Sequence, residues 1–437
     1  MSRHPLYPIY ENNSGWNQLL PPREPRQIQK PDSQYAYVVV GAGYTGMAAA
    51  RRLAELNPDE EILLCDAGVV DSGSSGRNSG FMISEPHVAR ASHESRQLFA
   101  QRTHKQLRLY QTGVQALESL VKQHQIDCDW QAVGKYHAAA TAQGAEHLRE
   151  YLDGFQEWGV ECRELSAGEL AHDLGTRYYD YGYWTSHNVL IQPAALIRGL
   201  ADHLPENVHL SENTPVTAIS ATADGAEVHI GAHSVRTRAV MLATNGFLKE
   251  LGFLRDRLAI IYTYAGLSPE LSAEDIARSG AVENWGILPA HRLGTTLRRI
   301  HGNRFLVRTS YSYEKASPLP EVEALLRGRY VSRFPQLSDH SFESVWGGTT
   351  ALTRNGAFYL GQPAKNVFAA VGCNGVGILK GTVYGQLMAE MAMGGQSDLL
   401  SDALSLAEPS WLPPEPLRSL AIHSAIRFER WRAGKEM

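Results

Sequence analysis

The chain has 437 residues, 43% hydrophobic and 20% charged, a composition typical of a globular protein with one large or two smaller domains. Its formal net charge of −5 provides no basic field for nucleic acid, and no run approaches the ~18 apolar residues of a transmembrane segment. Its four cysteines are widely spaced and form no CxxC pair, so we expect no metal site and no disulfide framework. We expect a cytoplasmic protein.

The first 34 residues are rich in Pro, Gln and Asn, as in LLPPREPRQIQKPD. This composition predicts an N-terminal arm, residues 1–34, that lies extended on the surface or is partly disordered. We expect ordered structure to begin near Tyr35.

Residues 37–56, YVVVGAGYTGMAAARRLAEL, have the pattern of a strand, a glycine turn and a helix. Gly41 allows the tight turn, Gly43 lets the backbone approach a pyrophosphate, and Gly46 permits close helix–strand packing. The helix start offers free N–H groups and a positive dipole end to phosphates. The segment therefore predicts a nucleotide site.

Asp66 follows the next apolar strand, EILLC, about 20 residues past the last glycine of the turn. A carboxylate at this spacing accepts the ribose hydroxyls of an adenosine and disfavours a 2′-phosphate. The part of the nucleotide bound next to Asp66 is therefore predicted to be adenosine.

The loop GSSGRNSGF, residues 73–81, bears on the choice between NAD and FAD. A nicotinamide dehydrogenase has no evident need of a second small-residue loop here, whereas FAD must thread its longer ribityl–isoalloxazine part past close backbone. Ser74 or Ser75 can donate to the pyrophosphate, and the backbone of residues 77–80 can approach the ring. The pattern favours FAD; an NAD-dependent dehydrogenase and a non-catalytic flavin-binding protein are the alternatives.

The middle of the chain combines both secondary-structure types. Residues 91–175 have a helical pattern, residues 208–230 alternate as strands, and residues 239–246 form a buried strand that ends in a glycine turn. Residues 255–345 mix strand-like pieces with one helix.

A second glycine turn, GCNGVGILKG at residues 372–381, follows the strand NVFAAV and opens another helix. A helix start there can stabilise negative charge on a reduced flavin ring, with Gly375, Val376 and Gly377 against it. Lys380 either adds positive charge at this edge or points to solvent. The tail after it, residues 401–437, ends in a basic amphipathic segment that we expect to pack on the surface, with a partner helix or a membrane contact as the alternative.

Five motifs in this order resemble the D-amino-acid-oxidase-like FAD oxidoreductases over nearly the whole chain: GAGYTG with Asp66, SSGRNSG, LATNGF (242–247), WGGTTALTRNGAFYLG (346–361) and GCNGVG. SGRNSG is similar to the SGRNGG of the branch that contains γ-glutamylputrescine oxidase and L-pipecolate oxidase. The family also contains sarcosine oxidases whose flavin is bonded to a cysteine in the WGG region. This chain has only Gly and Thr at residues 347–350, so we expect non-covalent FAD.

The resemblance implies an α/β fold, with a discontinuous Rossmann-like FAD-binding domain and a second mixed-sheet α+β substrate domain. The expected boundaries are 35–90, 185–250 and 346–400 for the FAD-binding domain, 91–184 and 251–345 for the substrate domain, and 401–437 for the tail. It also implies that Val216 contacts adenine through its backbone, while Trp346 either walls the flavin pocket or packs in the core.

The reaction implied by the resemblance moves hydride from a C–H beside an amine nitrogen to flavin N5, leaving an imine that is hydrolysed or cyclised. The expected substrate is an amine or amino acid, above all a secondary cyclic one such as L-pipecolate, or alternatively an aminoacyl polyamine such as γ-glutamylputrescine. The electron acceptor, O2 or a quinone, and the oligomeric state stay open. A substrate carboxylate calls for an Arg with a Tyr hydroxyl beside it.

The resulting candidates form two sets. The predicted catalytic residues are Arg298, Arg308, Tyr262, Tyr311 and Lys380. The predicted cofactor-binding residues are Gly41, Gly43, Tyr44, Thr45, Gly46, Asp66, Ala67, Ser74, Ser75, Arg77, Asn78, Ser79, Gly80, Val216, Ala243, Thr244, Asn245, Gly246, Trp346, Gly348, Gly375, Val376, Gly377 and Lys380.

Overall fold

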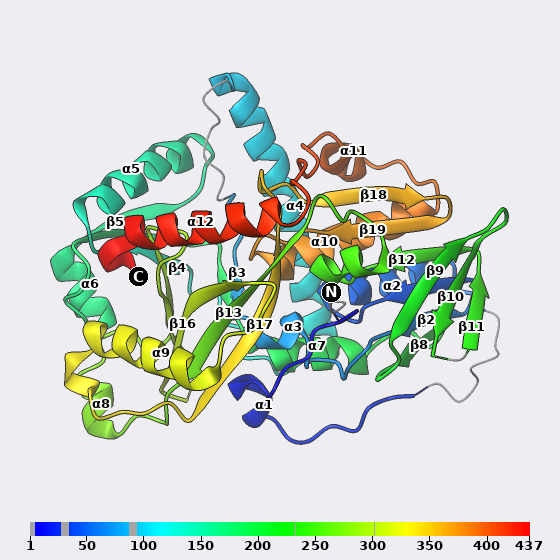
Figure 1. The fold of residues 1–437 in the computed structure, drawn as a ribbon. Coiled ribbons are helices and arrows are strands. Elements are labelled where there is room, and N and C mark those ends of the chain that lie inside the picture. The colour runs from blue at the N-terminus through cyan, green and yellow to red at the C-terminus, as the bar shows by residue number, and fades with distance from the viewer. Residues whose placement is uncertain (1–4, 28–34, 87–93, 232, 301) are drawn as a thin grey trace.

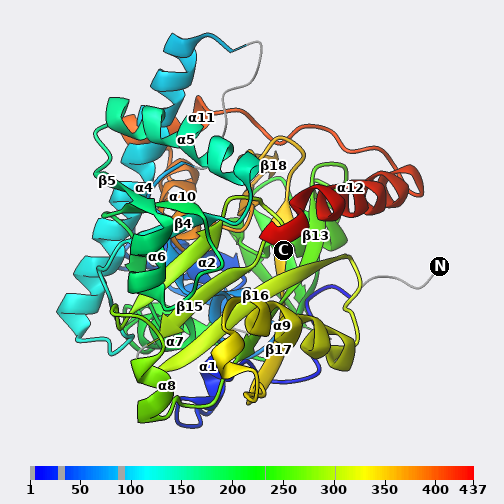
Figure 2. The ribbon, with the colours of Figure 1, turned by 90° about the vertical axis from the view of Figure 1, so that its left-hand side faces the viewer.

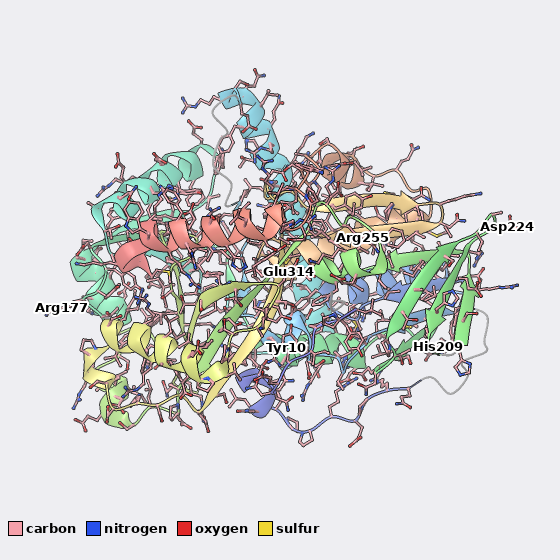
Figure 3. All side chains as sticks on the ribbon, viewed as in Figure 1. Tyr10, Arg177, His209, Asp224, Arg255 and Glu314 are labelled. Carbon is pink, nitrogen blue, oxygen red and sulfur yellow. The ribbon has the colours of Figure 1, made fainter. Side chains whose placement is uncertain are left out.

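The computed structural model describes residues 5–27, 35–86, 94–231, 233–300 and 302–437. The molecule is elongated, with a six-stranded sheet in one half and an eight-stranded sheet in the other (Figure 1). Arg177 and Asp224 lie at its opposite ends (Figure 3).

The six-stranded sheet has the order β18-β19-β12-β1-β2-β8, and all its pairs are parallel except β18 with β19. Its strands are β1 (Tyr37–Val40), β2 (Ile62–Cys65), β8 (Val208–Ser211), β12 (Ala239–Leu242), β18 (Tyr359–Ala364) and β19 (Val367–Val371). Every residue of β1, β2, β12 and β19 is buried, so both faces of the sheet are covered.

Helices cover one face of this sheet. They are α2 (Tyr44–Leu56), α4 (Arg96–His124), α7 (Pro193–Asp202), α10 (Gly377–Ala392) and α11 (Asp398–Leu404), with the short α1 (Gly15–Gln18) and α3 (Ser74–Arg77) beside α7. The opposite face carries a three-stranded antiparallel sheet of β9 (Val216–Ala221), β10 (Ala226–Ile230) and β11 (His233–Thr237). Strand alternation explains the division: Val39 of β1 joins the helical core and Val38 the three-stranded side.

Two glycines bring α2 and α10 into close contact. A Cβ on Gly381 would lie 2.9 Å from Thr45 Oγ1, and one on Gly385 would lie 2.2 Å from the Thr45 carbonyl oxygen. Only glycine allows this approach, which holds the start of α2 against the first turns of α10.

The eight-stranded sheet has the order β17-β13-β16-β15-β14-β4-β6-β5. Its strands are β4 (Lys135–Ala139), β5 (Cys162–Ser166), β6 (Tyr181–Thr185), β13 (Ala259–Leu267), β14 (Trp285–Pro289), β15 (Thr296–Ile300), β16 (Arg304–Tyr313) and β17 (Ser344–Leu352). Around it lie α5 (Ala142–Glu157), α6 (Ala167–Leu174), α8 (Ala273–Ala277), α9 (Leu319–Arg333) and α12 (Leu417–Ala433), and α12 lies on the outside in both ribbon views (Figures 1 and 2). Short elements complete the chain: β3 (Phe81–Met82), β7 (Val189–Leu190), η1 (Asn245–Leu251), η2 (Pro335–Leu337) and η3 (Gly434–Glu436).

Several local expectations need correction. Residues 91–175 are not uniformly helical, because β4 and β5 of the eight-stranded sheet interrupt them. The helix α4 lies in the segment expected for the substrate domain, but it packs in the core beneath the six-stranded sheet. The strand β17 lies mostly in the segment expected for FAD binding, but it pairs with β13 in the eight-stranded sheet. The arm is ordered before Tyr35: Trp16 is 1% exposed, and residues 28–34 lie outside the described ranges.

Within the described parts of the chain, no helix has the length and apolar character needed to cross a bilayer. The same residues contain no group of three or more His, Cys, Asp and Glu side chains arranged to hold a metal ion.

Candidate functional site

A cavity of about 460 Å³ lies between the two sheets. It is lined by the two glycine turns, the loop after β2, the start of α3, parts of β13, β15, β16 and β17, and residues 6–10 of the N-terminal arm. Three distant glycine-lined stretches therefore meet around one space, at the carboxyl ends of the parallel strands, where open α/β sheets bind their ligands.

The first turn has the backbone that its glycines imply. Gly41 has φ +100° and its Cβ would lie 2.8 Å from the Ala243 carbonyl oxygen, while a Cβ on Gly46 would lie 1.7 Å from the Gly41 carbonyl oxygen. Gly43 is the N-cap of α2, and no side chain caps this helix. Apart from the Tyr44 N–H, which bonds Ser75 Oγ, the N–H groups at the start of α2 have no side-chain acceptor among the described residues, as an anion site requires.

Asp66 is tied to the glycine turn by its own carboxylate. Its Oδ2 accepts the Ala42 N–H at 2.7 Å and its Oδ1 accepts the Gly68 N–H at 2.9 Å. Burial raises the pKa of Asp66 to about 6, against the lowering effect of these two bonds. Each oxygen keeps a lone pair for a further donor, so the residue fits a ribose diol.

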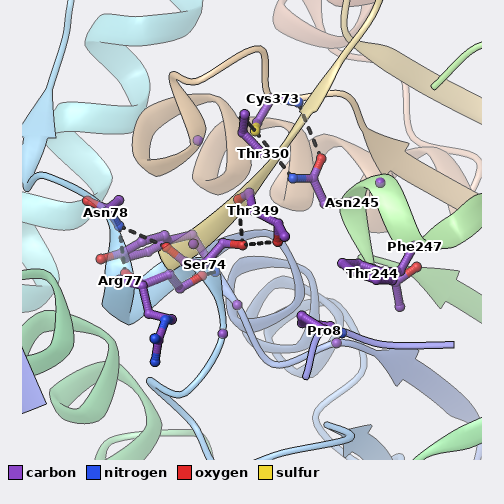
Figure 4. A pocket seen from close by; sticks show the side chains of 18 of the residues that line it. Pro8, Ser74, Arg77, Asn78, Thr244, Asn245, Phe247, Thr349, Thr350 and Cys373 are labelled. Carbon is purple, nitrogen blue, oxygen red and sulfur yellow. Dashed lines mark hydrogen bonds between the residues drawn. The ribbon is translucent and has the colours of Figure 1, made fainter. Parts of the chain in front are cut away.

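The two candidate serines of the loop after β2 have different partners, and Figure 4 shows Ser74 beside Thr349. Ser75 Oγ accepts the Tyr44 N–H at 3.3 Å, beside Gly43, whereas Ser74 donates to the Thr349 carbonyl oxygen at 2.7 Å. Ser75 therefore faces the turn that would hold a pyrophosphate, and Ser74 joins the loop to β17.

The second turn delivers another helix start to the same cavity. Gly375 has φ +81°, and Asn245 Oδ1 accepts the Gly372 N–H at 3.1 Å. Gly377 and Ile378, the first residues of α10, line the cavity, and no side chain caps this helix either. The starts of α2 and α10 therefore both face the cavity without a side-chain cap, and the buried Thr244 hydroxyl has no partner among the described residues. Together these donors suit a dinucleotide with an anionic ring.

The far end of the cavity is built from the eight-stranded sheet. Arg308 lines it, and its Nη1 donates to the Tyr311 hydroxyl at 3.0 Å; Tyr311 in turn donates to the Arg292 carbonyl oxygen at 3.2 Å. Among the described residues, no carboxylate lies within ion-pair distance of Arg308. Thr263 adds a buried hydroxyl without a partner among those residues.

A β-bulge explains why Arg308 and Tyr311 cooperate although they are three residues apart. Ser310 has φ +65° and is skipped in the pairing with β13, so Arg308 stands opposite Ala265 and Tyr311 opposite Thr263. The bulge reverses the strand alternation and turns both side chains to the same face.

Most predicted cofactor residues and one predicted catalytic residue line this cavity. They are Gly41, Gly43, Tyr44, Thr45, Asp66, Ala67, Ser74, Ser75, Arg77, Asn78, Ser79, Val216, Ala243, Thr244, Asn245, Gly246, Gly348, Gly375 and Gly377, together with Arg308. Tyr311 reaches it only through Arg308. Gly46, Gly80 and Val376 do not line the cavity: Gly46 packs against the Gly41 carbonyl oxygen, Gly80 against that of Ile191, and Val376 against the cluster of Phe81, Ile83 and Leu190.

Arg298 does not line the cavity. It is 1% exposed, and its Nη1 donates to the backbone oxygens of Ser79 and Gly80 at 3.2 and 3.3 Å. Burial lowers its pKa to about 10. Arg298 lies on the same face of the sheet as Arg308, on the neighbouring strand β15 and two residues past the position opposite Arg308. There it holds the loop at residues 79–80.

Tyr262, Trp346 and Lys380 also lie away from the cavity. Tyr262 packs in the core against α9, and its neighbour Thr263 lines the cavity. Trp346 packs with Trp16 in a separate core cluster. Lys380 neither lines the cavity nor points to solvent: it is 8% exposed, 5.8 Å from the ring centroid of Tyr110 on α4, and burial lowers its pKa to about 8.

The N-terminal arm is the part of the site that the sequence did not reveal. Residues 6–10, LYPIY, line the cavity. The Tyr10 hydroxyl lies 3.0 Å from Thr349 Oγ1, and the Arg77 guanidinium stacks over the Tyr10 ring at 4.0 Å. The only signal was the apolar and aromatic content of this stretch within an otherwise polar arm.

The fold and this cradle define a dinucleotide-binding protein whose site continues into a second, mixed-sheet half. The family model of FAD dependent oxidoreductases (DAO) matches residues 36–391, and the chain belongs to this family. It is therefore an FAD-dependent oxidoreductase, and the predicted family, fold class and cofactor are confirmed.

Individual relatives agree with this assignment. The chain is 27% identical to gamma-glutamylputrescine oxidoreductase of Escherichia coli over 362 residues, 82% of this chain and 83% of that protein. Glycine oxidase of Geobacillus kaustophilus has a similar structure, with a TM-score of 0.72 and 18% identity over 86% of this chain and 99% of that one. L-proline dehydrogenase of P. horikoshii superposes with a TM-score of 0.67 at 15% identity, covering 84% of this chain and 96% of that one.

Proposed function

We propose that this protein oxidises the C–N bond of an α-amino acid, specifically a secondary cyclic amino acid such as L-pipecolate. The observation that carries the proposal is Arg308, a cation that faces the cavity, is bonded to Tyr311 and has no ion-pair partner among the described carboxylates. A half-buried guanidinium that faces a cavity in this way is suited to a substrate carboxylate.

The charges of the cavity favour an amino acid over a polyamine. Its lining among the described residues contains two carboxylates, Asp66 and Asp71, and both belong to the nucleotide half. Asp71 is already paired with Arg198 and Asn17. A second ammonium group on a polyamine would therefore find no acidic partner at the Arg308 end.

The residues of this chain have three tasks in the reaction. Bound FAD supplies the hydride acceptor. Arg308 holds the substrate carboxylate, and Tyr311 holds Arg308. Apolar walls from Phe81, Ile83 and Leu288 exclude water and favour the neutral amine, which is the form that can release hydride.

We also propose that FAD is held without a covalent bond. Cys373 lines the cavity, but its thiol already lies 3.2 Å from Thr350 Oγ1 and 3.3 Å from Asn245 Nδ2. Acid precipitation should therefore release all flavin into the supernatant, and flavin that stays with the protein would refute this point.

The second candidate substrate is γ-glutamylputrescine, which the 27% identical relative suggests. Its glutamyl part also carries a carboxylate for Arg308, but the oxidised amine then lies at the far end of a long chain. The two candidates therefore differ in the distance between the carboxylate and the reacting carbon.

A substrate panel tests the proposal. Purified holoenzyme is assayed with both enantiomers of pipecolate and proline, with sarcosine, putrescine and γ-glutamylputrescine, each with O2 and peroxide detection and again with a quinone or dye acceptor. We expect the highest kcat/KM for a cyclic amino acid and weak activity with putrescine. A preference for γ-glutamylputrescine would establish the second candidate, and activity on amines that lack a carboxylate would overturn the role of Arg308.

A further inference from the structure

The outward face of α12 carries an apolar stripe that the proposed reaction does not use. Its side chains Leu417, Leu420, Phe428 and Trp431 are 59%, 67%, 54% and 78% exposed. At 3.6 residues per turn they fall within an arc of about 80° on one side of the helix. We call these four residues the α12 stripe.

The opposite side of the helix is firmly packed, so the stripe belongs to a fixed part of the molecule. Ile422 and Ile426 contact the core cluster of Tyr311, Tyr313 and Leu412. At the end of the chain, Arg333 Nη2 donates to the Met437 backbone oxygen at 3.0 Å. The helix therefore presents the stripe without having to move.

Positive charge borders the stripe on both sides. By the same helical geometry Arg427 flanks one edge and Arg432 the other, and both are exposed. The helix contains one acidic residue, Glu429, which is 16% exposed and lies 3.0 Å from His291 Nε2, 2.8 Å from Arg292 Nη2 and 4.0 Å from Arg432 Nη1. The exposed face is therefore apolar in the centre and cationic at its edges.

This combination selects one occupant. A second copy of the same helix would oppose arginine to arginine and offer no outward carboxylate from the helix. An anionic bilayer matches both features, because Trp and Phe side chains enter the interface and guanidinium groups lie at the level of the lipid phosphates. We infer that α12 docks in the plane of an anionic phospholipid surface, with the α12 stripe inserted.

Docking in this way orients the substrate end of the site toward the bilayer. Arg430 Nη2 donates to the Tyr311 carbonyl oxygen at 2.7 Å, and Glu429 holds the loop at 291–292 whose Arg292 carbonyl accepts the Tyr311 hydroxyl. The α12 stripe therefore lies one layer outside the Arg308–Tyr311 pair.

Vesicle flotation with the full-length FAD-loaded protein tests the inference. Vesicles of phosphatidylcholine alone are compared with vesicles made of equal parts of phosphatidylcholine and phosphatidylglycerol, each at low and at high salt. We expect flotation only with the anionic vesicles, loss of flotation at high salt, and a blue shift of tryptophan emission on binding.

Matched variants assign the effect to the α12 stripe. Phe428→Ser with Trp431→Ser should weaken binding at least about tenfold, and Arg427→Gln with Arg432→Gln should do the same through the electrostatic contribution. Leu98→Ser with Leu404→Ser is the control, because these leucines are 58% and 51% exposed on α4 and α11. Flavin content and thermal midpoint show that each variant is folded.

Two results would overturn the inference. One is equal flotation of the wild type and the Phe428→Ser, Trp431→Ser variant, or no flotation of either. The other is a mass in light scattering that is a multiple of the monomer and returns to the monomer in that variant, because it would make the α12 stripe a contact between copies of this chain.

Discussion

The role of Arg308 rests on its position among the cations of its own strand. Arg304, four residues earlier, forms an ion pair with Glu343 outside the cavity lining, whereas Arg308 lines the cavity and donates to Tyr311. Arg308→Met should lower kcat/KM for a carboxylate-bearing substrate by about 10- to 150-fold, the effect of losing charge-assisted hydrogen bonds of about 1.5–3 kcal/mol.

The matched control is Arg304→Met, for which we expect unchanged kinetics. Steady-state assays of both variants with the best substrate of the panel make the comparison. Equal losses in the two variants would indicate a general effect of strand charge and contradict a carboxylate contact at Arg308.

We predict that FAD binding depends on pH through Asp66. Burial raises the carboxyl pKa to about 6, so the FAD-free protein carries a protonated Asp66 below that pH and an ionised one above it. Ribose hydroxyls donate to the ionised form and lower its pKa, so protons and FAD compete. FAD affinity should therefore fall as the pH decreases through 6.

The measurement is the FAD dissociation constant between pH 5 and 8, followed by flavin fluorescence. Asp66→Asn should bind FAD more weakly at pH 8 and lose the dependence around pH 6. A variant that keeps the wild-type pH profile would show that another group controls it.

At the scale of elements, the contact between α2 and α10 sets the spacing of the two helix starts. Gly385→Ala places a Cβ 2.2 Å from the Thr45 carbonyl oxygen, which belongs to rigid backbone, so the helices must separate. We expect a loss of about 1–3 kcal/mol in the free energy of unfolding and weaker FAD binding, measured by denaturant titration and fluorescence.

Gly328→Ala in α9 is the matched helical control, because a Cβ there meets nothing within 4 Å. It should stabilise the protein by about 0.5–1 kcal/mol through helix propensity and leave FAD binding unchanged. If Gly385→Ala behaves like Gly328→Ala, the helices do not depend on this close approach.

Elements with a strong local pattern could be predicted from the sequence. The strand–turn–helix unit at residues 37–56 has a local signal, an apolar strand followed by Gly41 and Gly46. The sequence therefore predicts both the tight turn at Gly41 and the close packing at Gly46. The face that a residue occupies was less accessible. Thr263 lines the cavity in place of Tyr262, and the bulge at Ser310, which turns Tyr311 toward Arg308, has no glycine to mark it.

Residues whose environment comes from a distant element were hardest to predict. Lys380 follows the second glycine turn, yet its ammonium group lies near the ring of Tyr110 on α4, which comes much earlier in the sequence. Residues 6–10 have no periodic pattern, and Tyr10 meets Thr349 and Arg77 only in the folded chain. Pairings across hundreds of residues are set by tertiary packing and leave no local signal in one sequence.

At the scale of the whole molecule, the N-terminal arm joins the two halves across the cavity. Tyr10 contacts β17 of the eight-stranded sheet through Thr349, and the Trp16 indole N–H donates to the Asn78 carbonyl oxygen of the nucleotide loop at 2.7 Å. Arg77 depends on this arm, because its Nη1 donates to the Asn12 carbonyl oxygen at 2.9 Å and its guanidinium stacks on Tyr10.

A chain that begins at Ser14 should therefore release FAD faster. It loses the arm residues that line the cavity and leaves the Arg77 guanidinium with the Gly347 carbonyl oxygen as its remaining partner among these contacts. We expect at least a tenfold rise in the FAD dissociation rate, measured by the change in flavin fluorescence after dilution of the holoprotein, and a smaller thermal shift on adding FAD than in the full chain. Tyr10→Phe, which keeps the ring over Arg77 but loses the hydroxyl contact to Thr349, should lie between the two. Dissociation rates equal to the full chain in both variants would show that the cavity closes over FAD without the arm, and that the arm serves only the stability of the fold.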